Sequence, residues 1–379
     1  MNLNKSQYQV PPVGRMVSSL KVFLLLVTAA LLFGSCSKKD SVNPEPVIEP
    51  SSKQDIASVS ANGHYFIAAC NMANNKIEIY DSENYTSFDQ SGSFQWSWSP
   101  TTALGYTAAE VSAWAHPYSV QRRASNIWPG STEVWAATCR DGLATICRFV
   151  GGTRGQKLWA KDVGSDVYPH GIEVLPNGNV AIAGRKNGPG GWVRVYASSQ
   201  GPNNGTYANY NLDWAHGVLW DPGLNRLWAI GELPGGSDLD ILVGLIVGGT
   251  AAAPTLTEDM SMRVTLPSTG GHDVSAYYGY PNLLLVSDHL GVYKYNKTTK
   301  VFTALPGAAN RTDVKSISNQ KIGHIVQAKP NKTLCSLNDW CTIKAEFYDG
   351  TTGAWIYNRT RTGAAFYKTD VWWWEYQNI

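Results

Sequence analysis

Apolar and polar residues alternate in short runs along most of this chain, a pattern typical of β-strands with one buried face. The clearest stretch has a first run at 171–174, a turn at Pro176–Asn179 and a second run at Val180–Gly184. Further runs at 192–196 and 206–212 follow it. Proline, asparagine and glycine between the runs are the residues that tight turns require. No stretch keeps an i, i+3, i+4, i+7 apolar face for three helical turns, so we predict an all-β fold built from four-strand units.

Six such units follow one another. In each, a histidine or threonine opens the first strand, and the second strand ends at a charged or polar residue. The openings lie roughly 40–57 residues apart, which is typical of propeller blades rather than helical repeats. They are His116, His170, His216, His272, Thr312 and Thr369. The pattern predicts a six-bladed β-propeller over residues 61–379.

One unit is divided between the two ends of the propeller sequence. Its second and third strands are expected at Tyr65–Cys70 and Lys76–Asp81, where no first strand precedes them. The missing strand is expected at Thr369–Trp374. A C-terminal strand would then complete the N-terminal blade and close the ring, leaving only short sheet edges. A β-sandwich, the alternative all-β fold, accounts neither for the repeat length nor for this divided unit.

Two polar columns are expected to meet at one mouth of the central channel, where first strands begin and second strands end. The first column contains the six opening residues. The second contains the residues that end the second strands, namely Arg140, Arg185, Glu232, Asp288, Lys329 and Asn71. Aromatic residues two positions before the openings share their side of the strand, and these are Trp114, Tyr168, Trp214 and Tyr367. The prediction is a binding site formed by both columns and this aromatic rim.

Imidazole is a common metal ligand, and it transfers protons near neutral pH. A set of four, His116, His170, His216 and His272, is therefore predicted to surround the mouth and to be able to hold a divalent metal ion. His170 and His216 are the candidate proton-transfer residues. Any single histidine at a strand start is more often a capping residue, and the chain has no H-E-x-x-H motif. Four in register on adjacent units favour a site.

The N-terminal segment predicts export. Arg15 and Lys21 are positively charged, and the apolar run Val22–Phe33 is too short to span a bilayer comfortably. Its end, Gly34-Ser35-Cys36, resembles the bacterial lipoprotein signal, which implies cleavage after residue 35 and acylation of Cys36. Residues 37–60 are rich in proline, serine and glutamate and are expected to form a flexible tether. We expect a lipid-anchored envelope protein facing the periplasm or the cell surface.

Composition adds two constraints. A net charge of +2 over 379 residues argues against nucleic-acid binding, which needs a concentrated basic surface. Cys335 and Cys341 share one loop and could form a disulfide in an oxidising compartment. A bridge between Cys139 and Cys147 is disfavoured by their unequal distances from the intervening turn, and Cys70 is expected to be a small buried hydrophobe.

The layout of residues 61–379 resembles the six-bladed propellers of the NHL and gluconolactonase-like kind. Some members of that group hold a metal ion at the channel mouth through histidines from several blades. Propeller lyases that act on uronate-containing glycans use histidine with arginine or tyrosine. The resemblance implies a polar, carbohydrate-derived ligand, with an anionic one suited to the cations, and a metal- or histidine-dependent glycan lyase. The alternative is a non-catalytic propeller that binds proteins or glycans.

Overall fold

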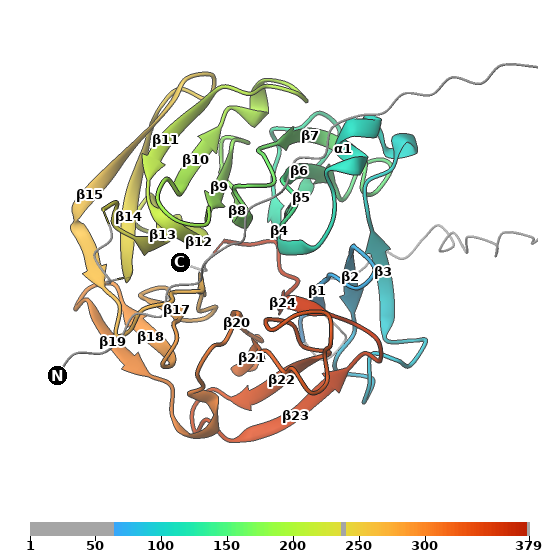
Figure 1. Ribbon diagram of the computed structural model, residues 1–379, viewed down its shortest axis with the longest axis vertical. Helices are drawn as coiled ribbons and strands as arrows, with labels where there is room; N and C mark the ends of the chain where they lie inside the picture. Colours follow the sequence, from blue (N-terminus) through green and yellow to red (C-terminus); the bar gives the residue numbers. More distant parts are fainter. Residues whose placement is uncertain (1–63, 236–239, 377–379) are drawn as a thin grey trace, which may run out of the picture. The chain divides into compact units, whose positions relative to one another are not determined.

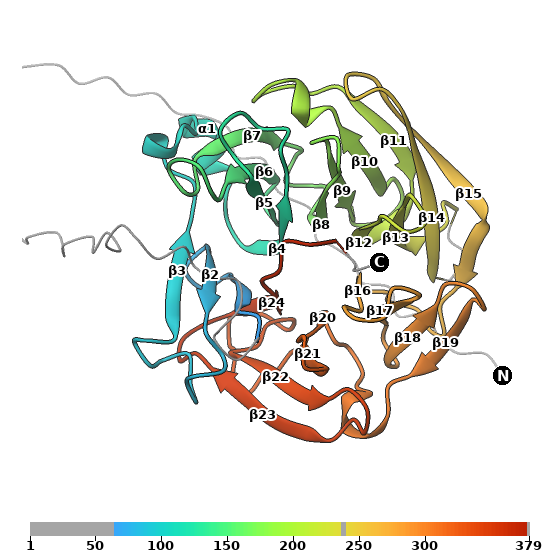
Figure 2. The same cartoon turned by 180° about the vertical axis from the view of Figure 1, so that it is seen from behind.

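The computed structural model describes residues 64–235 and 240–376. These residues form six four-stranded antiparallel sheets arranged in a ring around a common axis, which confirms the predicted six-bladed propeller (Figures 1 and 2). The expected lipoprotein signal, Cys36 and the tether lie outside the described residues. Within those residues, no helix is long and apolar enough to cross a membrane.

The blades are numbered here from the one that joins the chain ends. Blade 1 contains β24 (Phe366–Val371), β1 (Ile67–Asn71), β2 (Lys76–Tyr80) and β3 (Phe94–Trp98). Blade 2 contains β4 (Pro117–Ala124), β5 (Glu133–Cys139), β6 (Leu143–Arg148) and β7 (Lys157–Asp162). Blade 3 contains β8 (Pro169–Val174), β9 (Val180–Gly184), β10 (Trp192–Tyr196) and β11 (Tyr207–Asn211).

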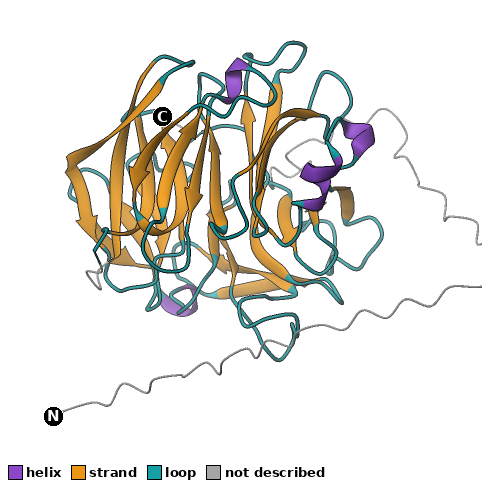
Figure 3. Cartoon of the chain, turned by 45° about the horizontal axis from the view of Figure 1, so that its top comes forward, coloured by secondary structure: helices purple, strands orange, loops and turns teal. Residues whose placement is uncertain are grey.

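The second half of the ring repeats this order. Blade 4 contains β12 (Asp213–Asp221), β13 (Arg226–Glu232), β14 (Asp240–Gly249) and β15 (Pro254–Thr265). Blade 5 contains β16 (Asp273–Ala276), β17 (Leu283–Ser287), β18 (Val292–Asn296) and β19 (Val301–Ala304). Blade 6 contains β20 (Ser316–Asn319), β21 (His324–Ala328), β22 (Lys344–Asp349) and β23 (Trp355–Thr360). The described helices are short and lie in connecting segments (Figure 3): α1 (Ala108–Ser112), η1 (Thr102–Leu104), η2 (Ser198–Gln200) and η3 (Gly307–Ala309).

The ring closes through the C-terminal strand, as predicted. β24 pairs with β1 in antiparallel register, with Ala69 opposite Thr369. The strand runs from Phe366 to Val371, so it begins and ends three residues earlier than expected. Trp372 follows it, donates its backbone N–H to the Phe66 carbonyl at 2.7 Å and is buried in a core cluster with residues of blades 1 and 2. The aromatic run after β24 therefore fills the core rather than extending the strand.

The first strands of the six blades contact one another in a closed circle, in the order β4, β8, β12, β16, β20 and β24. Close approach between two of them depends on glycine. A Cβ on Gly171 would lie 2.8 Å from the backbone oxygen of His216 and 3.0 Å from the Cα of Gly217. A side chain at Gly171 would push β8 and β12 apart, and with them the residues that begin these strands.

A disulfide joins Cys335 to Cys341 across a Cα–Cα distance of 5.8 Å, which confirms the predicted pairing. Cys70, Cys139 and Cys147 are free and buried, so the disfavoured Cys139–Cys147 bridge is not formed. Both disulfide cysteines are buried in a small cluster that includes two tyrosines from the start of β4 and β24. The disulfide thus braces the loop against the channel mouth.

Candidate functional site

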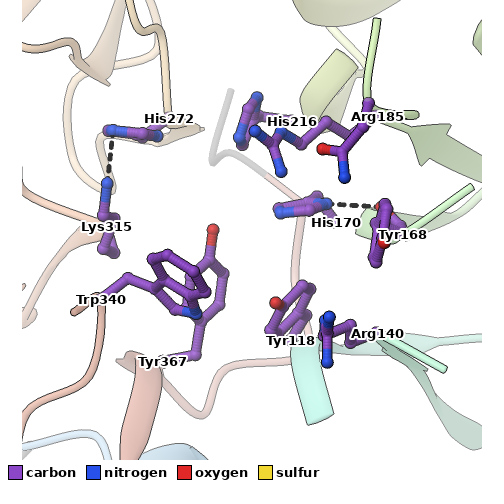
Figure 4. A pocket seen from close by; sticks show the side chains of 11 residues that line it. Tyr118, Arg140, Tyr168, His170, Arg185, His216, His272, Lys315, Trp340 and Tyr367 are labelled. Atoms are coloured by element: carbon purple, nitrogen blue, oxygen red, sulfur yellow. Dashed lines mark hydrogen bonds between the residues drawn. The ribbon is translucent and has the colours of Figure 1, made fainter. Parts of the chain in front are cut away.

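A cavity of about 260 Å³ opens at the channel mouth. Residues from every blade line it, as Figure 4 shows. The lining residues are Tyr118, Arg140, Tyr168, His170, Arg185, Asn187, His216, His272, Lys315, Trp340 and Tyr367. We call this cavity the mouth pocket.

Each blade contributes one side chain from the start of its first strand, and we call these six residues the inner ring. They are Tyr118, His170, His216, His272, Lys315 and Tyr367. Neighbouring rings are in contact: the centroids of His170 and His216 lie 4.5 Å apart, and those of His216 and His272 lie 5.2 Å apart. The structure therefore brings three of the four predicted histidines together.

A repeated backbone conformation places these side chains. In five blades the residue two positions before the inner-ring residue has a left-handed backbone, with φ between 48° and 70°. These residues are His116, Tyr168, Trp214, Gly270 and Asp313. Left-handed φ is unfavourable for residues with a Cβ and is often kept where a site requires it. The same turn in five blades explains why side chains from different blades converge.

His116 does not take the expected place. The predicted alignment matched Trp114-Ala115-His116 to Trp214-Ala215-His216, but the structure shifts blade 2 by two residues. His116 adopts the left-handed turn, and the irregular pairing between Pro117 and Ser119 leaves Tyr118 in the inner ring. The His116 Nδ1 lies 2.7 Å from the Asp141 carboxylate, outside the lining of the pocket. The predicted four-histidine metal set is therefore not assembled.

The two predicted threonines also lie elsewhere. Thr312 is exposed and accepts a hydrogen bond from the Lys329 ammonium at 2.9 Å, while Lys315 occupies the ring position of blade 6. Thr369 is buried inside β24, so Tyr367 takes the ring position of blade 1. In both blades the polar residue chosen from the sequence is close to the ring position but not in it.

Of the second predicted column, Arg140 and Arg185 line the pocket. Asn71 instead donates to Glu78 at 2.9 Å, and the Asp288 carboxylate accepts from two backbone N–H groups of its own turn. The members outside the lining are Asn71, Glu232, Asp288 and Lys329. These four residues end or directly follow second strands as expected, but they do not line the cavity.

Of the predicted aromatic residues, some line the pocket and others do not. Tyr168 lines the pocket beneath Arg140, whose guanidinium lies 5.2 Å from its ring centroid. Trp214 stays behind Arg185, with 4.1 Å between guanidinium and ring. Trp114 is buried and donates its indole N–H to the Asn75 carbonyl at 2.8 Å. Only Tyr168 of these three is in a position to touch a ligand.

The mouth pocket is positively charged. Arg140, Arg185 and Lys315 line it, and no carboxylate does so among the residues the structure describes. The Arg185 Nε–H is buried and has no hydrogen-bond partner within 64–235 and 240–376. Buried donors without partners are costly unless a ligand satisfies them. The arrangement favours an anionic ligand with several acceptor oxygens.

The imidazoles are neutral. Burial lowers the pKa of His170 and of His216 well below the usual range, and the neighbouring His216 and Arg185, respectively, add to the effect. Their Nδ1 atoms contact the carbonyl oxygens of Tyr168 and Trp214. A carbonyl can only accept, so Nδ1 carries the proton and Nε2 keeps its lone pair. Both rings can act as acceptors or bases.

Lys315 is the most unusual cation of the ring. Burial lowers its pKa to about 8, and its Nζ lies 2.6 Å from the His272 Nε2. Burial also lowers the pKa of His272, and Lys315 is the next contributor, so this imidazole accepts from the ammonium. No sequence motif marked Lys315, because its position depends on the left-handed turn at Asp313.

An aromatic wall faces the histidines. The Tyr118 and Tyr367 rings stack with centroids 4.2 Å apart, and burial raises the pKa of both hydroxyls, which stay protonated. Trp340, 44% exposed, comes from the disulfide loop and also lines the pocket (Figure 4). Sequence reasoning found the disulfide but missed Trp340, which has no repeat partner in other blades.

No protein with a curated description matches the chain. The sequence profile of a family described as a family of unknown function (DUF6528) matches residues 18–335. Among solved structures, the chain is similar to a protein of unknown function from Bacteroides caccae, at 10% identity and a TM-score of 0.50, covering 80% of this chain and 97% of that one. It is also similar to a chain of the nidogen/laminin complex, at 10% identity and a TM-score of 0.49, covering 81% and 97%. At these identities the likeness concerns the fold.

Proposed function

The chain belongs to the family of unknown function DUF6528, and we propose that its mouth pocket binds a carboxylate-bearing, carbohydrate-derived ligand on a lipid-anchored envelope protein. The observation that carries the proposal is the set of three cations, Arg140, Arg185 and Lys315, in a pocket without a lining carboxylate among the described residues. Charge-assisted hydrogen bonds from arginine to a carboxylate are among the strongest in proteins. A neutral ligand would leave this charge uncompensated.

The size and walls of the pocket support a sugar. A cavity of about 260 Å³ suits a ligand of about one sugar unit, since pockets for drug-sized molecules start near roughly 300 Å³. Trp340 and the stacked pair Tyr118 and Tyr367 provide aromatic faces, against which the apolar face of a sugar ring can pack. Neutral imidazoles opposite this wall offer acceptors for hydroxyl groups.

The same inventory supports β-elimination on a uronate. The Nε2 of His170 or His216 would take the proton next to the carboxylate, while Arg140 or Arg185 stabilises the charge that develops on its oxygens. The electron pair forms a carbon–carbon double bond as the bond to the departing glycosidic oxygen breaks. A protonated hydroxyl, Tyr118 or Tyr367, would supply a proton to that oxygen. This chemistry needs no further reactant.

Binding is tested by titrating the purified protein with uronate oligosaccharides and with their neutral counterparts, by calorimetry. We expect the uronates to bind and the neutral sugars to bind at least about 10-fold more weakly. Arg185→Gln should weaken uronate binding about 10–100-fold, because a hydrogen bond to a charged group contributes about 1.5–3 kcal/mol. Lys329→Gln is the matched control, since Lys329 also follows a second strand but lies outside the pocket. Equal binding of neutral sugars, or an equal loss in both variants, contradicts the proposal.

Turnover separates a lyase from a binding protein. If the pocket catalyses elimination, ultraviolet absorbance of the unsaturated product should grow with time and disappear in at least one of the variants His170→Gln and His216→Gln, while uronate still binds. Binding without any absorbance change in the unaltered protein would favour the non-catalytic alternative.

The anchor is a separate part of the proposal, and it depends on the resemblance of residues 1–36 to a lipoprotein signal. Cys36→Ser removes the thiol that would be acylated. We expect the variant to leave the membrane fraction, or to accumulate as an uncleaved precursor, in cell fractionation followed by mass spectrometry. A variant that is processed at the same site and still sediments with membranes would show that Cys36 is not the anchor.

A further inference from the structure

A second polar cluster lies at the edge of the mouth pocket. His272 precedes β16, His289 follows β17 of the same blade, and Asp313 precedes β20 of the next blade. One ligand atom from each of the three lies within 4.8 Å of the other two. We infer that His272, His289 and Asp313 form a binding site for a divalent transition-metal ion, which goes beyond the proposed sugar binding.

The first support is an imidazole nitrogen without a partner. His272 is only 8% exposed, and its Nε2 is already used by Lys315 at 2.6 Å. Its Nδ1 is buried and has no hydrogen-bond partner in the described part of the chain. Buried polar atoms are nearly always satisfied, by protein, water or an ion. A metal ion would account for it by displacing the Nδ1 proton, with the ring then protonated on Nε2 and donating to Lys315 as a neutral amine.

The second support is the arrangement of the other two ligands. The His289 Nδ1 lies 2.6 Å from the Asp313 carboxylate, and the His289 ring stands perpendicular to the His272 ring, with centroids 5.5 Å apart. Both side chains are about half exposed, at 52% and 48%. They can therefore move the short distance needed to bring all three ligand atoms to about 2.0–2.2 Å from one ion.

The donor set indicates which ion is held. Two imidazole nitrogens and one carboxylate oxygen are typical ligands of Zn²⁺ and of neighbouring first-row metals, rather than of Ca²⁺ or Mg²⁺. Three protein ligands leave at least one position open, as catalytic sites require. Because His272 lines the mouth pocket, that position would lie beside the ligand of the pocket.

Nearby charges act in both directions. The Lys315 ammonium next to His272 opposes a cation. Buried Asp240 interacts electrostatically with His289 and favours a cation when it is ionised, although burial raises the pKa of this carboxyl. Charges of both signs therefore surround the proposed site, with Lys315 and Lys329 near Asp313 and the Asp240 carboxyl near His289.

The experiment uses full-length protein freed of metal by a chelator and titrated with Zn²⁺ alone. We expect one Zn²⁺ per chain by calorimetry and elemental analysis, and a higher melting temperature in its presence. His289→Ala and Asp313→Asn should each weaken Zn²⁺ binding at least about 100-fold, because loss of an outer-shell partner already costs about 10–100-fold. Both side chains are half exposed, so these variants should keep the fold.

His116→Ala is the matched control. His116 and Asp141 form a pair of the same type, 2.7 Å apart and about one-third exposed, and no third ligand completes a metal set there within the described residues. This variant should bind Zn²⁺ as tightly as the unaltered protein. No Zn²⁺ bound above background, or an equal loss in His116→Ala, overturns the site. Uronate titration of the metal-free protein tests the mouth pocket separately, so failure of one proposal is distinguishable from failure of the other.

Discussion

A chain that ends before Phe366 is expected not to fold. The deletion removes β24, which is the first strand of blade 1 and pairs with β1 at the opposite end of the propeller sequence. It also removes Phe366 and Trp372, which are 0% and 1% exposed. Loss of one such aromatic side chain costs about 3–5 kcal/mol, and domains are stable by only about 5–15 kcal/mol. Two such losses are as large as a typical margin, and the open sheet edge and the lost pairing with β1 weaken the fold further.

Circular dichroism melting and limited proteolysis measure the outcome. The truncated protein should show no cooperative transition, or should aggregate, and it should be cleaved rapidly. Removing only residues 377–379, which lie outside the described part of the chain, is the control and should leave the transition unchanged. A truncated protein with the native melting profile would show that β24 does not close the ring.

Arg123→Met is expected to destabilise the protein by about 3–5 kcal/mol, the range measured when one partner of a buried ion pair is removed. The Arg123 guanidinium in β4 and the Glu173 carboxylate in β8 form two hydrogen bonds between blades 2 and 3, of 2.8 and 2.6 Å. Their side chains are 1% and 0% exposed. Without the guanidinium, Glu173 would be a buried charge with no countercharge in the pair.

The stability lost in Arg123→Met should depend on pH. Burial raises the pKa of Glu173 even with Arg123 opposing it, so in Arg123→Met the carboxyl takes up a proton in the folded state more readily than in the unfolded state. A folded-state pKa above the unfolded value means that stability falls as pH rises through the unfolded pKa, near about 4.3. The free energy of unfolding of Arg123→Met should therefore fall least below that of the unaltered protein in acid, and most near neutral pH.

Urea unfolding of the single and double variants gives the coupling energy. Arg123→Met combined with Glu173→Gln should recover part of the stability lost in the single variant, because no charge is then buried. The control is Arg361→Met, which breaks the exposed Arg361–Asp89 pair (40% and 39% exposed) and should cost less than about 1 kcal/mol. Equal losses in Arg123→Met and Arg361→Met would show that the buried pair has no special role.

The sequence by itself determined the six blades and their closure, because both depend on local patterns. Turn residues such as Pro176–Asn179 set hairpins wherever they occur, and alternating apolar runs mark the strands on either side. The divided blade was recognisable because Tyr65–Cys70 lacks a first strand and the C-terminus has one in excess. The Cys335–Cys341 disulfide was also predictable, since both cysteines share one short loop.

Tertiary structure decided which residues reach the channel mouth. A strand alternates its faces with a period of two, so a shift of two residues leaves the apolar pattern unchanged. The sequence could not distinguish His116 from Tyr118 for this reason, and the left-handed turn at His116 placed Tyr118 in the pocket. The same turn at Asp313 brings in Lys315 instead of Thr312.

The sequence pattern likewise did not predict contacts between segments that lie far apart in the chain. Trp340 reaches the pocket because its disulfide loop packs against tyrosines of blades 1 and 2, a contact without any periodic signal. The charge of the pocket depends on which carboxylates lie near the cations, and the sequence holds nearly equal numbers of both signs. Chain composition therefore cannot predict a positive cavity, because only the packing of blades determines which charges face each other.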